Sequence, residues 1–238
     1  MGKGETETVR GLLDAGADPN TPGLRTVYHH GKYQHRPSGT LLHIAARGGH
    51  EGTATVLLEG GAEINSTDAD GTTPLMVAAH NGHTVATRQL LEAGAQPNLA
   101  DKNGETALHH ACSAGDEVVA ALAEGGADLN RTDNDGLTPL MKAAEACETA
   151  VVRRLLALGA DHAVVATGEA YEDLTAVDLA DGGGGEDEDE QAELVGVLRE
   201  WEAKHADEEY VRAFVAKENS REERMNRVRP RANHLFDG

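Results

Sequence analysis

Histidine is the residue type in this sequence best suited to proton transfer or metal binding near neutral pH. Its copies gather in three places: His80 with His83, His109 with His110, and His29 and His30 with His35. No carboxylate or thiolate completes the third group as a metal site, and adjacent histidine side chains rarely converge on one ion. The two cysteines, Cys112 and Cys147, are too far apart in the chain to form a Cys-x-x-Cys pair.

The motifs of common catalytic sites are absent from the sequence. There is no His-Glu-x-x-His, no Gly-x-Ser-x-Gly and no kinase signature. The glycine run at 182–185 is followed by acidic residues instead of the Lys-Ser/Thr of a phosphate-binding loop. We therefore expect no catalytic residue, no metal and no cofactor, and we predict that the chain is not an enzyme.

Two short phrases recur along the chain and organise it. The first, Leu-Leu-Asp-Ala-Gly-Ala-Asp-Pro-Asn at 12–20, returns at 57–65, 90–98 and 122–130, and degenerately at 155–163. The alanine after its glycine recurs at intervals of 45, 33, 32 and 33 residues. The second phrase, Gly-Thr-Thr-Pro-Leu-Met-Val-Ala-Ala at 71–79, returns at 104–112 and 136–144, with weaker copies at 39–46 and 174–180.

Each phrase indicates one half of a helical hairpin. Thr73-Pro74 marks a helix start, because threonine caps free N–H groups and proline suits the first turn. The pair Ala78-Ala79 lets this first helix lie close to its neighbour, and Leu90-Leu91 supplies larger apolar side chains in a second helix. Gly94 follows that helix, where a left-handed residue ends it cheaply. Such a unit buries its apolar face only when it is stacked on others.

These phrases resemble the Thr-Pro-Leu-His and Gly-Ala-Asp-x-Asn motifs of the ankyrin repeat family, which recur every 33 residues. The resemblance covers about residues 5–180. It implies an all-α repeat solenoid of stacked helix-turn-helix units with hairpin loops. We expect about five units, preceded by an N-terminal half-repeat and followed by a C-terminal helical tail. The half-repeat is either a cap or the start of a fragment, and we favour the fragment because caps present a polar outer face.

Several positions depart from the family pattern. The motif histidine, which is structural in the family, remains at His43 and His109. Two units carry methionine in its place: Met76 and Met141. Cys147 stands where glycine is usual, and Asp178 stands where the histidine is expected. We therefore expect the fourth and fifth units to be the less regular ones.

The organisation along the chain predicts two parts. Residues 1–205 form the solenoid, and residues 206–238 form a charged helical C-terminal tail. The solenoid is interrupted near 21–37 by an insertion of about 12 residues, and at 182–190 by an acidic, glycine-rich loop that cannot pack. Helical spacing returns in Leu194, Leu198 and Trp201, which we interpret as part of the last stacking helix.

Three interpretations of the insertion stay open. It is a tolerated surface loop, a finger whose aromatic and basic residues touch a partner, or a metal site. The finger residues are Tyr28, His30, Tyr33 and Arg36. The metal interpretation uses His29, His30 and His35 and is the weakest of the three, since those histidines lack a completing ligand.

The charge of the chain limits its partners. The sequence holds 21 Lys+Arg against 41 Asp+Glu, a formal net charge of −20. This charge argues against binding to nucleic acid or to an anionic membrane surface, since both need a basic face. We expect a cytoplasmic monomer, with the nucleus as an open alternative. Residues 210–238 hold seven basic and four acidic side chains, and they fold back on the acidic solenoid, dock an acidic partner or are simply solvated.

The resemblance implies binding on a concave face, which is made of hairpin tips and the inner surface of each first helix. The residues at these positions are polar and weakly acidic, which suits a neutral or basic protein or peptide. They are Asp70, Thr72, His80, Asn81, Lys102, Asn103, Glu105, Ser113, Asn134, Asp135, Leu137 and Glu145. We predict a non-catalytic protein-protein interaction module, an adaptor or scaffold. The alternative is a regulatory or substrate-recruiting fragment of a larger enzyme, such as a kinase or ubiquitin ligase component.

Asparagines close three copies of the first phrase: Asn65, Asn98 and Asn130. We interpret them as turn residues that bond their own backbone. The alternative is that they resemble the asparagines that are hydroxylated in some animal ankyrin proteins.

Overall fold

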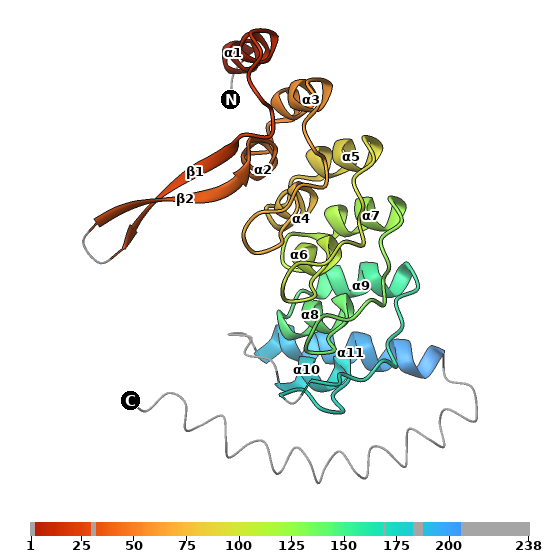
Figure 1. The fold of residues 1–238 in the computed structure, drawn as a ribbon. Coiled ribbons are helices and arrows are strands. Elements are labelled where there is room, and N and C mark those ends of the chain that lie inside the picture. Colours follow the sequence, from red (N-terminus) through yellow and green to blue (C-terminus); the bar gives the residue numbers. More distant parts are fainter. Residues whose placement is uncertain (1–2, 30–31, 169, 183–187, 206–238) are drawn as a thin grey trace. The chain divides into compact units, whose positions relative to one another are not determined.

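The computed structural model describes residues 3–29, 32–168, 170–182 and 188–205 (Figure 1). The chain divides into two compact units, residues 1–198 and 199–238, and each is described by itself. The predicted tail at 206–238 lies outside the described residues, as do residues 183–187 of the predicted acidic loop. The predicted boundary at 205 stays a prediction.

The described elements form a single helix followed by five helical pairs. The single helix is α1 (Lys3–Asp14). The first three pairs are α2 (Leu41–Arg47) with α3 (Glu51–Glu59), α4 (Pro74–His80) with α5 (Thr84–Glu92), and α6 (Ala107–Ala111) with α7 (Asp116–Glu124). The last two are α8 (Pro139–Glu145) with α9 (Thr149–Ala157), and α10 (Ala176–Gly182) with α11 (Glu188–Lys204). The predicted half-repeat and five units are confirmed.

The insertion is a β-hairpin, a form that the sequence analysis did not specify, and the other described elements are helices. Strand β1 (Pro22–His29) pairs antiparallel with β2 (Lys32–Thr40), and Tyr28 lies opposite Tyr33 in the register. Strand β2 continues three residues past the predicted insertion near 21–37, to Thr40, the residue that caps α2. Periodicity gave no sign of strands here, because the insertion has no second copy in the chain.

Two rows of helices form the stack. The inner row runs through α2, α4, α6, α8 and α10, and the outer row runs through α1, α3, α5, α7 and α9 (Figure 1). Leucines from both rows are almost fully buried between successive units: Leu42, Leu75, Leu108 and Leu140 from the inner helices, and Leu57, Leu90, Leu122 and Leu155 from the outer ones. Small residues such as Ala78 and Ala79, both 0% exposed, let the inner helices approach closely. The prediction of a stacked helical solenoid is confirmed.

The N-terminal caps of the inner helices explain the Thr-Pro-Leu phrase. The hydroxyl of Thr73 accepts a hydrogen bond from the N–H of Met76, and Thr138 does the same for Met141. The Thr73 N–H in turn lies 3.3 Å from the Met76 sulfur. Methionine therefore keeps the local cap, but its thioether carries no hydrogen with which to reach the next unit.

The motif histidines connect one unit to the next. His43 accepts a hydrogen bond from the Thr40 N–H at its Nδ1, so its Nε2 carries the hydrogen and donates to the Thr72 carbonyl, 2.9 Å away. His109 makes the equivalent bonds with Thr106 and Leu137. Burial lowers the pKa of His43, and the bond to Thr72 opposes that effect only in part. The ring is therefore neutral in the fold.

The asparagines of the first phrase are also connections between units, which corrects our interpretation that they bond their own backbone. The side-chain oxygen of Asn65 accepts from the N–H of Gln96, and that of Asn98 accepts from Asp128. Asn130 binds the N–H of Asp161 in the same way, 2.7 Å away. Each asparagine thus binds the backbone of the following repeat.

The fifth and fourth units use substitutes for two family residues. The Asp178 carboxylate accepts bonds from the N–H and hydroxyl of Thr175, at 2.8 and 2.7 Å, and so takes over the local role of the motif histidine. Cys147 has a φ of 57°, in the left-handed region, where its counterparts are Gly49, Gly82 and Gly115. A non-glycine residue in that conformation stores strain.

Replacing Cys147 with glycine tests this strain. We expect Cys147→Gly to raise the free energy of unfolding by about 0.5–1 kcal/mol, because relief of the left-handed conformation outweighs the entropy that glycine adds to the unfolded chain. Urea denaturation measures the change. The control Gly82→Ala places a side chain at φ 72° and should lower stability by about 1 kcal/mol. A Cys147→Gly protein that unfolds at lower urea would contradict the assignment.

The neutral His43 predicts a pH dependence of stability. Because its folded pKa lies below the unfolded value of about 6.5, the unfolded chain binds the proton more readily, and stability is lost as the pH falls below that value. His43→Met copies the residue at 76 and 141 and removes this contribution. The melting-temperature difference between wild type and His43→Met should be largest at pH 7.5 and shrink towards pH 5. A constant difference, or an equal trend in a His80→Ser control, would contradict it.

Candidate functional site

The hairpin tips are built around one aspartate each. The Oδ1 of Asp101 accepts from the N–H groups of Asn103 and Glu105, at 2.8 and 3.0 Å. Asp68 and Asp133 bond the backbone two and four residues ahead in the same way. In each hairpin these hydrogen bonds fix the turn, and the second carboxylate oxygen of the aspartate remains available for other contacts.

Adjacent tips are tied to one another by backbone bonds. The N–H of Lys102 donates to the Asp70 carbonyl, and that of Asn134 donates to Asn103. The N–H of Gly168 continues the series to Asp135 at 2.8 Å. These bonds connect the tips of successive hairpins, and binding by the predicted tip residues stays a prediction. Their side chains are exposed for Asp70, Lys102, Asn103, Asn134 and Asp135.

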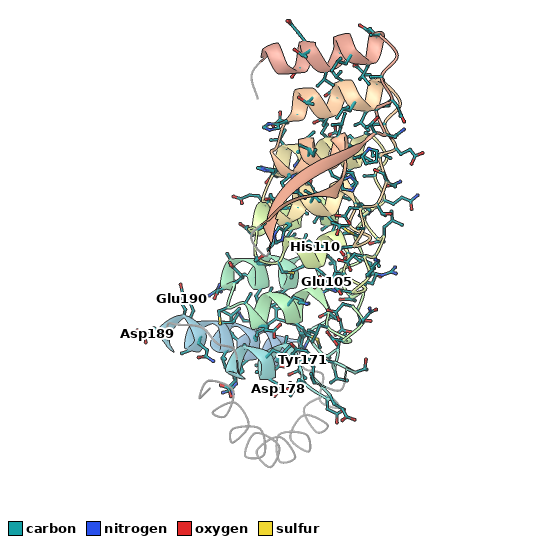
Figure 2. The ribbon with its side chains drawn as sticks, turned by 60° about the vertical axis from the view of Figure 1, so that its left-hand side comes forward. Glu105, His110, Tyr171, Asp178, Asp189 and Glu190 are labelled. Carbon is teal, nitrogen blue, oxygen red and sulfur yellow. The ribbon has the colours of Figure 1, made fainter. Side chains whose placement is uncertain are left out.

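A row of polar side chains on the inner helices lies beside these tips. His110 on α6 bonds the Asp101 carboxylate through Nε2, 3.0 Å away. Figure 2 shows His110 beside Glu105. Lys142 holds the same position on α8, and its Nζ lies 2.7 Å from Glu105 and 3.4 Å from Asp133. Lys142 thus joins the hairpins of two successive units. Sequence reasoning missed it, although it lies four residues after the capping Thr138, as His110 does after Thr106.

Lys142 is the positive centre of this face. Partial burial lowers the pKa of its ammonium, but the hydrogen bond and charge of Glu105, together with Asp133, outweigh that effect and raise it. Asp133 is the more buried of the two carboxylates, with 2% of its side chain exposed. A buried carboxylate without a cation is costly, so the three groups depend on one another.

Three further predicted site residues lie on or directly after the inner helices: His80, Ser113 and Glu145. His80 lies on α4, and its ring makes a T-shaped contact with that of His110, at 6.1 Å between centroids. On α8, Glu145 accepts a hydrogen bond from the hydroxyl of Tyr171, 3.0 Å away. Burial and this bond raise the pKa of Tyr171. Ser113 holds the corresponding position after α6 and is exposed.

Several predicted site residues have other roles. Leu137 is 1% exposed and belongs to the core, so the prediction that its side chain contacts a partner is wrong. Asn81 and Asn134 donate their side-chain amides to the carbonyls of Val77 and Lys102. Thr72 is half-buried, and its N–H bonds Asp68. These polar groups already form hydrogen bonds within the chain.

The predicted finger is described only in part. His30 lies outside the described residues, and the structure gives only the backbone of Tyr28, Tyr33 and Arg36. Binding by the finger, and a metal site at His29, His30 and His35, stay predictions.

One cluster of possible metal ligands lies beside the hairpin tips among the described residues. Asp101, Glu105 and His110 offer ligand atoms within 4.8 Å of one another, which is close enough for a metal ion. Lys142 already supplies a cation to Glu105, and His110 bonds Asp101, so the cluster is satisfied by residues of the chain. The thiol of Cys112 is buried, and burial raises its pKa to about 12, which keeps it protonated and non-nucleophilic.

These features define a helical repeat solenoid whose inner helices α6 and α8 carry charged and polar side chains beside the hairpin tips. A family model described as ankyrin repeats (3 copies) matches residues 1–101 and 86–166, more than half of the chain. The chain belongs to the ankyrin repeat family. Ankyrin repeats are in general protein-interaction modules.

The curated relatives share a short segment with this chain. Rabankyrin-5 of Homo sapiens is 41% identical over 64 residues, and Rabankyrin-5 of Mus musculus is 41% identical over the same length. The match covers 27% of this chain and 6% of each relative. None of the helices among the described residues is long and apolar enough to span a membrane.

Removing Lys142 tests the mutual dependence of the inner-face charges. We expect Lys142→Val, which copies Val77 of α4, to lower the free energy of unfolding by about 1–2 kcal/mol because Asp133 loses its cation. Chemical denaturation at pH 7 measures it. The change should be smaller in a Glu105→Gln background, since the two residues interact directly. Additive effects of the two substitutions would contradict the coupling.

Proposed function

We propose that this protein is a non-catalytic adaptor or scaffold that binds a protein or peptide segment on the concave face. One observation carries the proposal: the exposed tip residues and the inner-helix polar row form one surface, fixed by bonds between successive hairpins. A pre-formed surface of this kind loses little conformational entropy on binding.

The charges on this surface favour a neutral or basic segment. Asp70, Asp135 and Glu145 lie on it in addition to the carboxylates that Lys142 neutralises. Lys102 is the exposed basic residue on the described tips. Complementary charge speeds association and selects among partners, so a lysine- or arginine-containing segment suits the face. We place the protein in the cytoplasm or the nucleus, where its free cysteines stay reduced.

The test is affinity capture from native-host extract followed by mass spectrometry. The variant carries Asp70→Ala, Lys102→Ala, Asn103→Ala and Asp135→Ala, which change exposed tip side chains and leave the Lys142 contacts in place. We expect partners of the wild type to be lost from this variant, and their binding to weaken at higher salt because charges contribute.

A matched control carries Glu92→Ala and Glu117→Ala on the outer helices, which are also exposed. This control should keep the partners. Partners kept by the tip variant and lost by the outer-helix control would contradict binding on the concave face.

A further inference from the structure

The fifth hairpin is longer than the fourth. The N–H of Ala166 donates to the Leu174 carbonyl as that of Asp133 does to Leu137, so the two pairs hold matching positions. Between these positions the fifth hairpin has four residues more than the fourth, and Tyr171 lies in this longer segment. Aromatic residues make up only 3% of the chain, and they are enriched where proteins contact their partners.

The longer segment is held against the fourth unit. The N–H of Gly168 donates to the Asp135 carbonyl at 2.8 Å, and the N–H of Tyr171 donates to the Gly168 carbonyl at 3.0 Å. The Tyr171 hydroxyl donates to Oε1 of Glu145 on α8, 3.0 Å away (Figure 2). Tyr171 is therefore fixed by its backbone and by its hydroxyl, beside a hairpin tip and an inner helix of the concave face.

The polar groups around Tyr171 offer hydrogen-bond acceptors. The hydroxyl gives its hydrogen to Glu145, so towards a further group its oxygen can only accept. The second carboxylate oxygen of Glu145 and the exposed carboxylate of Asp135 are acceptors as well. Burial and the bond and charge of Glu145 raise the pKa of Tyr171, and the charge of Asp135 adds to this, so the hydroxyl stays protonated. A group that binds here has to donate hydrogen bonds.

The basic residue of α8 is engaged elsewhere. The ammonium of Lys142 lies 2.7 Å from Glu105 and 3.4 Å from Asp133. Within the part of the chain that the structure describes, no ion pair joins a basic side chain to Glu145 or Asp135. These two carboxylates therefore remain available to a cation from outside the chain.

The acceptor on α8 is particular to the fourth unit. Glu145 is the seventh residue after the capping Thr138, and the three preceding inner helices carry other residues at this position: Arg47, His80 and Ser113. The site is thus placed at one end of the concave face and is not repeated along it.

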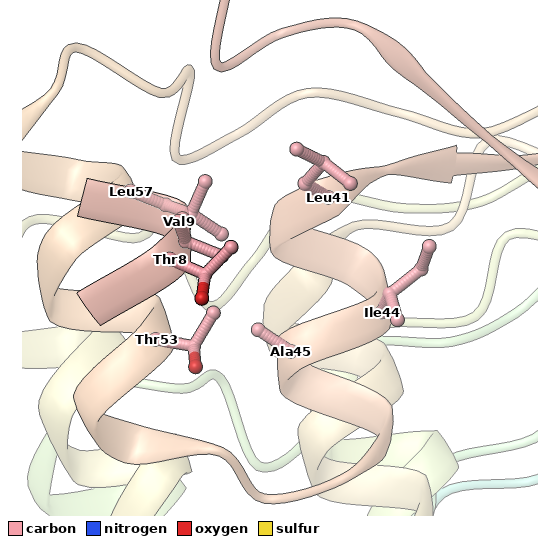
Figure 3. Close-up of a pocket in the computed structure, with 7 residues that line it drawn as sticks. All are labelled: Thr8, Val9, Leu41, Ile44, Ala45, Thr53 and Leu57. Atoms are coloured by element: carbon pink, nitrogen blue, oxygen red, sulfur yellow. The ribbon is translucent and has the colours of Figure 1, made fainter. Parts of the chain in front are cut away.

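The cavity between α1, α2 and α3 has the opposite chemistry. It measures about 280 Å³, and Figure 3 shows Thr8 and Val9 of α1 across from Leu41 and Ile44 of α2. None of its seven lining residues is charged. A basic side chain would lose its hydration there without meeting an opposite charge, in contrast to the groups around Tyr171.

We propose that Tyr171, Glu145 and Asp135 bind an arginine side chain of the partner segment on the concave face. The inference rests on the proposed function, and it names the side chain that this end of the face selects. A guanidinium group has five N–H donors in one plane, pairs with carboxylates through two parallel bonds and stacks on aromatic rings. The lysine ammonium lacks the planar shape, so arginine suits the three residues better. We call them the arginine site.

The first test selects binders from a phage-displayed library of random 12-residue peptides on the full-length protein. We expect arginine to recur at one position of the enriched sequences. Glu145→Gln keeps the shape of the side chain and removes its charge, so this protein should no longer enrich arginine. The matched control Glu117→Gln makes the same change at an exposed residue of the outer helix α7 and should enrich the same sequences as the wild type.

The second test measures one enriched peptide by isothermal titration calorimetry beside a copy that carries citrulline, which resembles arginine in shape but has no charge. Citrulline should weaken binding to the wild type about tenfold or more, as expected for the loss of hydrogen bonds to a charged group. It should change binding to Glu145→Gln less than about threefold, because the two changes remove one interaction. Tyr171→Leu removes the ring and the hydroxyl and should weaken binding of the arginine peptide several-fold. Melting temperatures show that each variant is folded.

The outcomes separate the arginine site from the proposed function. Enriched sequences without arginine, equal affinity for the citrulline peptide, or an equal loss in Glu117→Gln would overturn the arginine site. If those peptides still lose binding to a protein with Asp70→Ala, Lys102→Ala and Asn103→Ala, the concave face binds and only the arginine site is wrong. A selection that enriches no sequence would also overturn the arginine site, and the proposed function would then be judged by capture from native-host extract.

Discussion

No unit of this chain can bury its own apolar face, and the rest of the structure depends on that constraint. Inner and outer leucines are shielded only when the next unit covers them. The polar connections follow the same rule. Asn65 satisfies the backbone at Gln96, and His43 satisfies the carbonyl of Thr72. Residues of each repeated phrase therefore bond the backbone of the next unit. This explains why the spacing of the phrases is kept while individual residues differ between units.

Such differences between units are tolerated where the replacing residue keeps the hydrogen bonds of the helix cap. Met76 gives up the connection that a histidine makes to the next unit but keeps the threonine cap. Asp178 accepts the same cap bonds with a carboxylate. Cys147 keeps the left-handed conformation of a glycine at an energetic cost. These exchanges lie in the second, fourth and fifth units.

The same stacking fixes the polar side of the inner row. Hairpins held in register by backbone bonds carry the tip residues, and Lys142 ties two of these hairpins to an inner helix.

The repeat, the helix pairs and the threonine caps could be predicted from the sequence, because these depend on contacts within about 33 residues that every unit repeats. The sequence did not predict the β-hairpin at 22–40, since the insertion occurs once and offers no periodicity. Only the tertiary structure showed that Leu137 is core, that Lys142 joins Glu105 to Asp133, and that the asparagines bond the following unit. These outcomes depend on how one unit is placed against the next, and side-chain burial and charge pairing follow from that placement.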